Sequence, residues 1–223
     1  FYEKDRFVSH LDSTASDTIE KLYDSLITEE KPIILDLMAS WDSHLSPAAR
    51  SRAGSIVGLG LNPRELEANE ALTESVIHDL NREPELPFPD AWFDVVLNTV
   101  SVDYLTRPLE VFCEIHRILK PGGLFVVTFS NRMFPQKAIR IWKASSEEER
   151  VLLVEDYFRA AGGFEDPQTF LSKGKPRPRD DKYASTTLES DPVYAVMASR
   201  EGSTASQRPL RRREGAPTVG LDQ

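Results

Sequence analysis

The sequence predicts a Rossmann-like α/β fold with a largely parallel sheet, on three observations. Short continuous apolar runs, such as residues 33–37 and 93–98, recur along the chain, as expected of strands that are buried on both faces. Segments with apolar residues at helical spacing separate these runs. The 223 residues, 40% hydrophobic and 28% charged, suit one ordinary globular domain. Strands that alternate with helices in this way indicate right-handed βαβ units.

The first half of the chain predicts two helices and three strands. A first helix is expected over residues 15–26, with Ser13 or Thr14 as its cap. Its apolar residues share one stripe: Ile19, Leu22, Tyr23 and Leu26. Two buried strands, a helix that begins at a proline and a short third strand follow, over residues 33–37, 55–59, 63–69 and 75–78.

The second half continues the alternation. A strand over 93–98 precedes a helix that begins at Pro108 and is closed by Pro121-Gly122-Gly123. The predicted apolar face of this helix consists of Leu109, Phe112, Ile115, His116 and Leu119. The remaining elements are a strand over 124–129, helices over 135–143 and 147–161, and a strand over 193–198. Residues 173–181 are charged and contain proline, so we expect an exposed loop there.

The composition predicts a single domain over residues 1–200, in which residues 1–30 form an N-terminal helical cap. Residues 201–223 are rich in Ser, Gly, Pro and Arg, and we expect a disordered tail. Cys113 is the only cysteine, which fits a reducing compartment and a packing role in its helix. We therefore expect a cytoplasmic protein. The chain begins at Phe1, so an upstream targeting segment stays open.

The charge balance favours a small-molecule substrate. A net charge of −9 argues against broad contact with nucleic acid, because phosphate binding needs a basic face. No apolar run approaches the roughly 20 residues that a membrane span requires. The four histidines and one cysteine lack the spacing of a zinc site, so we expect no metal. The oligomeric state is not indicated.

Ligands of parallel α/β sheets bind beyond the carboxyl ends of the strands. The segments that follow the five predicted parallel strands are therefore where a site is expected: residues 36–45, 60–64, 79–81, 98–104 and 130–134.

Residues 33–132 resemble the cofactor-binding half of the small "type 11" class I methyltransferases, which use S-adenosylmethionine (SAM). Asp79-Leu80 and residues 86–94, LPFPDAWFD, match the D-x…LPFPDxxFD signature of this family. Residues 114–123, EIHRILKPGG, match its E-x-x-RVLKPGG signature. The resemblance implies the class I methyltransferase fold, a mostly parallel seven-stranded sheet with helices on both faces. A dinucleotide-binding fold is the weaker alternative, because G-x-G-x-x-G is absent.

The resemblance also implies SAM as cofactor and a set of residues that bind it. Asp79 would accept a hydrogen bond from the adenine amino group, while the backbone amide of Leu80 meets the ring. The loop after the first strand would contact the cofactor through Asp36, Met38, Ala39 and Ser40. Asn62 and Asn98, at the ends of two further strands, complete the predicted binding set.

Two departures from the family pattern concern this cofactor site. The family reads D-x-G-x-G-x-G after its first strand, whereas this chain has Met38, Ser40 and Asp42 in place of glycines. The acidic residue that normally binds the ribose is replaced by Gly60, for which Asn62 is an uncharged substitute. Either the loop is rebuilt and still binds the cofactor, or the affinity for SAM is lost.

No catalytic residue is indicated, because methyl transfer needs alignment more than a catalytic triad. Candidate substrate contacts are His10, Tyr104, Asn131 and Arg132, the last as a binder of carboxylate or phosphate. Structural alternatives stay open for each: Asp12 as a helix cap beside a surface His10, Tyr104 as a packing residue, and Arg132 in a salt bridge. His44 would serve as a base or make a structural hydrogen bond.

Two functions remain in competition. The first is a SAM-dependent methyltransferase that acts on a small molecule. The alternative is a protein of the same fold that has lost methyl transfer and serves as a binding or scaffold subunit, or catalyses another reaction. Methylation of RNA or protein is disfavoured by the net charge and by the lack of an added recognition domain.

Overall fold

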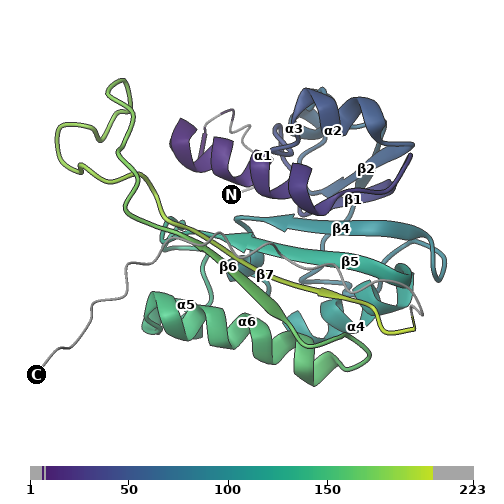
Figure 1. Ribbon diagram of the computed structural model, residues 1–223. Helices are drawn as coiled ribbons and strands as arrows, with labels where there is room; N and C mark the ends of the chain where they lie inside the picture. The colour runs from purple at the N-terminus through teal and green to yellow at the C-terminus, as the bar shows by residue number, and fades with distance from the viewer. Residues whose placement is uncertain (1–6, 8, 203–223) are drawn as a thin grey trace, which may run out of the picture.

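A seven-stranded sheet with the order β3-β2-β1-β4-β5-β7-β6 forms the centre of the computed structural model, which describes residues 7 and 9–202 (Figure 1). The strands are β1 (Ile33–Leu37), β2 (Ser55–Gly60), β3 (Glu74–Ile77), β4 (Phe93–Thr99), β5 (Leu119–Phe129), β6 (Gln168–Ser172) and β7 (Val193–Ser199). The first five strands are parallel, and β7 runs antiparallel to β5 and β6. This confirms the predicted mostly parallel seven-stranded sheet.

Helices cover both faces of the sheet, as predicted (Figure 1). One face carries α1 (Ser13–Leu26), α2 (Pro47–Arg52) and α3 (Pro63–Glu67). The other carries α4 (Pro108–Ile118), α5 (Arg140–Ala144) and α6 (Glu147–Ala161). A short 3₁₀ helix, η1 (Val102–Tyr104), follows β4. Two clusters of buried apolar side chains, one for each face, fix the sheet between the helix layers.

Local signals in the sequence explain where most helices begin and end. The α6 helix begins with a capping box between Ser146 and Glu149, and it ends at Gly162, whose φ is 70°. The α1 helix is capped by Asp12, whose Oδ1 accepts the Ala15 amide at 3.0 Å. The prediction of Ser13 or Thr14 as the cap is therefore wrong by one or two residues.

Several predicted details of the second half are also wrong. The buried residues of α4 are Val111, Phe112, Ile115 and Ile118. This stripe turns Leu109 and Cys113 to the solvent side, so Cys113 is exposed and not packed. Leu119 already belongs to β5. The helix predicted from residue 135 begins only at Arg140.

Besides the short 3₁₀ helix η1, two elements were missed. The α2 helix is short, although Ser46 as cap and Pro47 at its first position are recognisable start signals. The β6 strand lies at the sheet edge, where its exposed polar residues lack the continuous apolar run of a central strand.

The register of the sheet brings five strand ends to one edge. Leu37 pairs with Leu59 and with Asn98, and Gly60 pairs with Ile77. The segments after these strands therefore face the same space. Within the described residues, none of the helices has the length and apolar character that crossing a bilayer demands, and no group of three or more His, Cys, Asp or Glu side chains could hold a metal ion.

Candidate functional site

A pocket lies at this edge of the sheet, where the segments after β1 to β5 meet. Its mouth is open to solvent, and the volume of its cavity is about 140 Å³. The lining residues are His10, Asp36, Met38, Ala39, Ser40, Asp42, His44, Leu59, Gly60, Leu61, Asn62, Glu65, His78, Asp79, Leu80, Asn81, Thr99, Val100, Ser101, Tyr104 and Phe134.

The pocket brings together nine of the predicted site residues, and three others lie outside it. The lining includes Asp36, Met38, Ala39, Ser40, Asn62, Asp79 and Leu80 from the predicted cofactor set, with His10 and Tyr104 from the predicted substrate set. Asn98 is buried, and its amide donates to the Leu37 carbonyl at 3.3 Å. Asn131 is exposed. The Arg132 guanidinium lies 3.7 Å from Asp191 and 4.4 Å from the Tyr183 ring centre, as in the salt-bridge alternative.

The loop after β1 keeps a backbone shape that glycine normally supplies. Met38 has a φ of 62°, in the left-handed region that side chains disfavour. The next amide, of Ala39, donates to the Leu59 carbonyl at 2.8 Å and ties the loop to the end of β2. The Ala39 carbonyl then occupies the space that a β-carbon at Gly60 would need. The missing glycines and the missing acidic residue are therefore one linked rearrangement, and the space beside the loop stays open.

A carboxylate reaches the pocket from α3. The Ser40 Oγ donates to Glu65 Oε2 at 2.6 Å, and the Asn62 amide donates to Glu65 Oε1 at 3.3 Å. The Asn62 Oδ1 meanwhile caps α3 by accepting the amides of Arg64 and Glu65. Sequence reasoning missed Glu65, although an acidic residue three positions after an Asn cap is a recognised helix-start pattern.

Asp36 is a buried carboxyl group at the base of the pocket. Only 3% of the residue is exposed, and the Ser43 Oγ donates to its Oδ2 at 2.6 Å. Burial raises its pKa to about 7, more than the Ser43 hydrogen bond lowers it, and the charge of Asp42 raises the pKa further. Near neutral pH both protonation states of Asp36 are therefore populated.

Two histidines flank the pocket with defined partners. Burial lowers the pKa of His44, whose Nδ1 lies 3.6 Å from Asp42 Oδ2. The His78 Nε2 lies 2.8 Å from the Glu83 carbonyl oxygen, which accepts its hydrogen bond. At neutral pH the lowered pKa keeps His44 uncharged.

The end of β3 is fixed to the segment after β4. Asp79 Oδ1 accepts the Asn81 amide at 3.0 Å, and the Asn81 side chain donates to the Tyr104 carbonyl at 3.0 Å. Nearby, the buried Ser101 Oγ lines the pocket without a hydrogen-bond partner in the described part of the chain.

Three rings, which we call the aromatic wall, form one end of the pocket: His10, Tyr104 and Phe134. The His10 and Phe134 rings meet edge to face with centroids 5.2 Å apart, and those of Tyr104 and Phe134 are 6.3 Å apart. The Phe134 amide also donates to the Tyr104 hydroxyl at 2.9 Å. The wall thus joins the N-terminal segment, η1 and the loop after β5.

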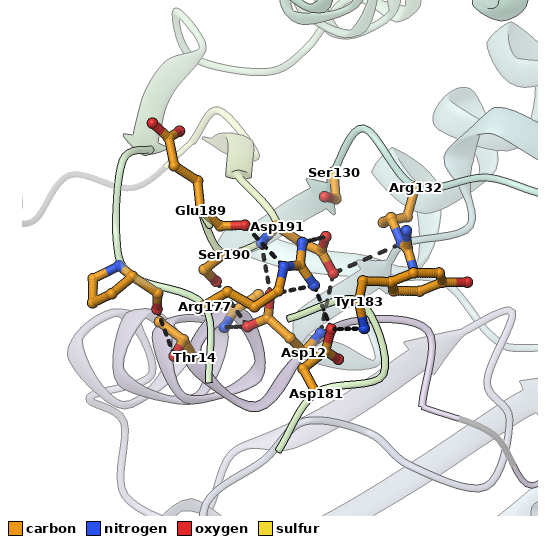
Figure 2. A network of polar contacts seen from close by, with 12 residues as sticks. Asp12, Thr14, Ser130, Arg132, Arg177, Asp181, Tyr183, Glu189, Ser190 and Asp191 are labelled. Carbon is orange, nitrogen blue, oxygen red and sulfur yellow. Dashed lines mark hydrogen bonds and ion pairs between the residues drawn. The ribbon is translucent and has the colours of Figure 1, made fainter. Parts of the chain in front are cut away.

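A buried ionic network, which we call the latch, joins Asp12, Arg177, Asp181 and Asp191 (Figure 2). The Arg177 guanidinium lies 3.3 Å from Asp12, 2.8 Å from Asp181 and 2.6 Å from Asp191, and its side chain is only 4% exposed. Asp12 Oδ2 also accepts the Asp191 amide at 2.7 Å. The expectation of a wholly exposed loop over 173–181 is therefore wrong at Arg177, because three carboxylates offset its burial.

The latch lies close to the aromatic wall along the chain. Asp12 is two residues after His10, and Arg132, which contacts Asp191, is two residues before Phe134. Figure 2 shows the N-terminal segment, the β5 loop and the segment before β7 converging on this network. The latch thus includes or contacts residues two positions from each of two wall residues, His10 and Phe134.

Comparisons with known proteins give a consistent family. Residues 37–127 match the family model described as "Methyltransferase domain". The demethylmenaquinone methyltransferase of Lysinibacillus sphaericus is 32% identical over 93 residues, which are 40% of this chain and 38% of that protein. This chain thus aligns with less than half of that relative's length.

Solved structures share the fold at low sequence identity. A SAM-dependent methyltransferase from Archaeoglobus fulgidus is 14% identical with a TM-score of 0.57, covering 83% of this chain and 94% of its own. The Haemonchus contortus phosphoethanolamine N-methyltransferase 2, solved in complex with SAM, gives a TM-score of 0.57 at 14% identity and covers 85% of this chain and 53% of its own. At such identity these likenesses concern the fold alone.

Proposed function

Because the chain carries a class I SAM-dependent methyltransferase domain, we propose that its pocket binds SAM and that it transfers the methyl group to a small molecule. The alternative, a fold that has lost methyl transfer, is not favoured by the comparisons. The observation that carries the proposal is the open pocket beside the glycine-poor loop, where Met38 takes the backbone conformation of a glycine.

The residues of the pocket fit the chemistry of this cofactor. The adenine ring requires apolar neighbours and an acceptor for its amino group, and Leu61, Leu80 and Val100 with Asp79 offer both. The sulfonium and ammonium groups are positively charged, and the carboxyl groups of Asp36, near the end of β1, and Asp42, in the loop after it, both line the pocket.

The ribose hydroxyls need an acceptor that Gly60 cannot supply. We propose Glu65 for this role, with Asn62 as its supporting partner, because Ser40 and Asn62 already hold its carboxylate at the pocket. Asn98 then supports the loop through its hydrogen bond to the Leu37 carbonyl and does not touch the ligand.

SAM supplies an electrophilic methyl group on a sulfonium, which an acceptor atom displaces in line. The chain's own part is to align the acceptor and to exclude water. A base helps only when the acceptor atom carries a proton. Two groups of the pocket can take up that proton: Asp36, whose pKa is raised by burial to about 7, and His44, whose pKa is lowered by burial. We assign the alignment to the aromatic wall.

Calorimetric titration of S-adenosylhomocysteine into the protein tests the cofactor part of this proposal. We expect saturable binding, and we expect Asp79→Ala to weaken it because the adenine amino group loses its acceptor. The matched control is Asp156→Asn. Asp156 is an exposed acid on α6, outside the pocket, so this variant should bind the ligand as the unaltered protein does. The proposal is refuted if millimolar ligand produces no heat of binding and no thermal shift.

A further inference from the structure

We propose that the aromatic wall is the acceptor subsite and that it selects an acceptor without negative charge on an apolar or aromatic body. The inference rests on the proposed function, because the acceptor must share the pocket with SAM. It goes beyond that function in stating which chemical class of small molecule the pocket takes.

The wall offers ring surfaces from three segments of the chain. The edge-to-face contact of His10 with Phe134, and the nearby ring of Tyr104, create an apolar surface with partly negative ring faces. Such surfaces bind apolar groups by burial, and the faces of the Phe134 and Tyr104 rings attract cations. The geometry thus favours an aromatic, aliphatic or amine-bearing acceptor.

The charges of the pocket point the same way. Four acidic residues line it, namely Asp36, Asp42, Glu65 and Asp79, and none of the described lining residues is a lysine or an arginine. An anion that entered would lose its water without gaining a counter-charge, in a field that is already negative. An uncharged or cationic molecule avoids both penalties.

The cation next to the wall in the sequence is turned away. Arg132 lies two residues before Phe134, yet its guanidinium contacts Asp191 and the Tyr183 ring. Figure 2 shows Arg132 reaching toward the latch from the β5 loop. The contact that would have recognised an anionic acceptor is therefore used to support the latch.

A series of probes with one body and three head groups tests the selection. Protein saturated with S-adenosylhomocysteine is titrated with 2-phenylethylamine, 2-phenylethanol and 3-phenylpropionate, and binding is followed by saturation-transfer NMR and calorimetry. We expect the amine to bind at least as well as the alcohol, and the acid to bind about tenfold more weakly or not at all, because unpaired like charges oppose it.

Variants assign the result to the wall. Phe134→Ala should weaken the amine and the alcohol, whereas Trp92→Ala, an exposed aromatic outside the pocket, should change neither. His10→Lys should reverse the order by binding the acid and repelling the amine. Equal or tighter binding of the acid by the unaltered protein overturns the inference, and so does absence of binding for all three probes or an unchanged Phe134→Ala variant.

The order of measurements separates the two proposals. Binding of S-adenosylhomocysteine is measured first on the same preparation, and its absence counts against the proposed function. Normal binding of this ligand with the wrong order of the three probes counts against the acceptor subsite alone.

Discussion

The carbonyl oxygen of Ala39 occupies the position that a β-carbon on Gly60 would need. Two departures that look independent in the sequence, a loop without glycines and a strand end without an acid, are therefore a single feature of the structure. The Ala39 amide, bonded to the Leu59 carbonyl, holds this backbone in place. A ribose-binding carboxylate at position 60 is incompatible with this loop.

Gly60→Ala is expected to destabilise the protein by about 1–3 kcal/mol, since a backbone atom must move to admit the methyl group. Gly58→Ala is the matched control on the same strand. Its β-carbon would meet Cδ1, Cδ2 and Cγ of the Leu72 side chain, which can move more easily than backbone, so a smaller loss is expected. Urea unfolding of both variants measures the difference. A Gly60→Ala variant as stable as the unaltered protein would contradict the proposed close contact.

Met38 provides an opposite test of the same loop. In ordinary backbone glycine is less stable than alanine by roughly 0.5–1 kcal/mol, but at a φ of 62° the order should reverse. We expect Met38→Gly to unfold at higher urea than Met38→Ala, although both lose the packing of the methionine side chain. The neighbouring Ala39 has no positive φ, so the control Ala39→Gly should be less stable than the unaltered protein, as in ordinary backbone. Met38→Ala more stable than Met38→Gly would show that the left-handed conformation is not retained.

The sheet could be predicted because β1, β4 and β5 contain continuous apolar runs, which can be recognised without knowledge of distant partners. It also predicted which loops meet, because the carboxyl ends of parallel strands share an edge. Nine of the predicted site residues accordingly line the pocket. Edge strand β6 was missed because its residues are exposed or only half-buried and lack the apolar run of a central strand.

Side-chain direction was less predictable than position. Arg132 lies on the expected rim, but its orientation depends on Asp191 and Tyr183, more than 50 residues away, which no local pattern reveals. Arg177 looked like one charge among many, because its partner Asp12 lies near the other end of the chain, although Asp181 and Asp191 are only four and 14 residues away. Glu65 carried a helix-start signal, which points to capping and gives no indication of the adjacent pocket.

Asp36 predicts a specific pH dependence of stability. Its pKa in the folded protein is about 7, above the ordinary value of 3.8, so the folded state holds the proton more tightly than the unfolded chain. The stability gained from this group is complete below about pH 4 and is lost as the pH rises to about 7. Asp36→Asn lacks this carboxyl group and so does not suffer the loss. The free energy of unfolding of the variant minus that of the unaltered protein should therefore increase by roughly 2 kcal/mol from pH 5 to pH 8.

Denaturant unfolding at pH 5 and pH 8 measures this difference. Asp156 is exposed, so the control Asp156→Asn should differ from the unaltered protein by the same free energy of unfolding at both pH values. If the gain of Asp36→Asn were the same at pH 5 and pH 8, the carboxyl group would titrate at its ordinary pKa in the folded protein.

The latch should contribute far more to stability than a surface ion pair. Arg177→Met leaves Asp12 buried without its counter-charge and leaves Asp191 with only its 3.7 Å contact to Arg132, and we expect a loss of about 3–5 kcal/mol. Lys173→Met removes a partly exposed cation that pairs with Glu147 and Glu148, for which at most about 1 kcal/mol is expected. Thermal and urea unfolding compare the two variants. Equal losses would mean that water screens the latch.

Glu65 offers the sharpest test of how the cofactor is held, because its proposed partners, the two ribose hydroxyls, can be removed from the ligand. Adenosine and 2′,3′-dideoxyadenosine are titrated into the unaltered protein and into Glu65→Gln. A charge-assisted hydrogen bond is worth about 1.5–3 kcal/mol, so the unaltered protein should prefer adenosine by roughly tenfold or more. In Glu65→Gln this preference should shrink, with little change for the dideoxy ligand.

Glu67→Gln, an exposed acid on the same helix, keeps the full preference if the effect belongs to the site. A merely structural role of Glu65 would weaken both ligands by the same factor and leave their ratio intact. In that case Asn62, and not Glu65, would bind the ribose hydroxyls. Its uncharged amide should give a weaker preference for adenosine, and this preference should not depend on the charge at position 65.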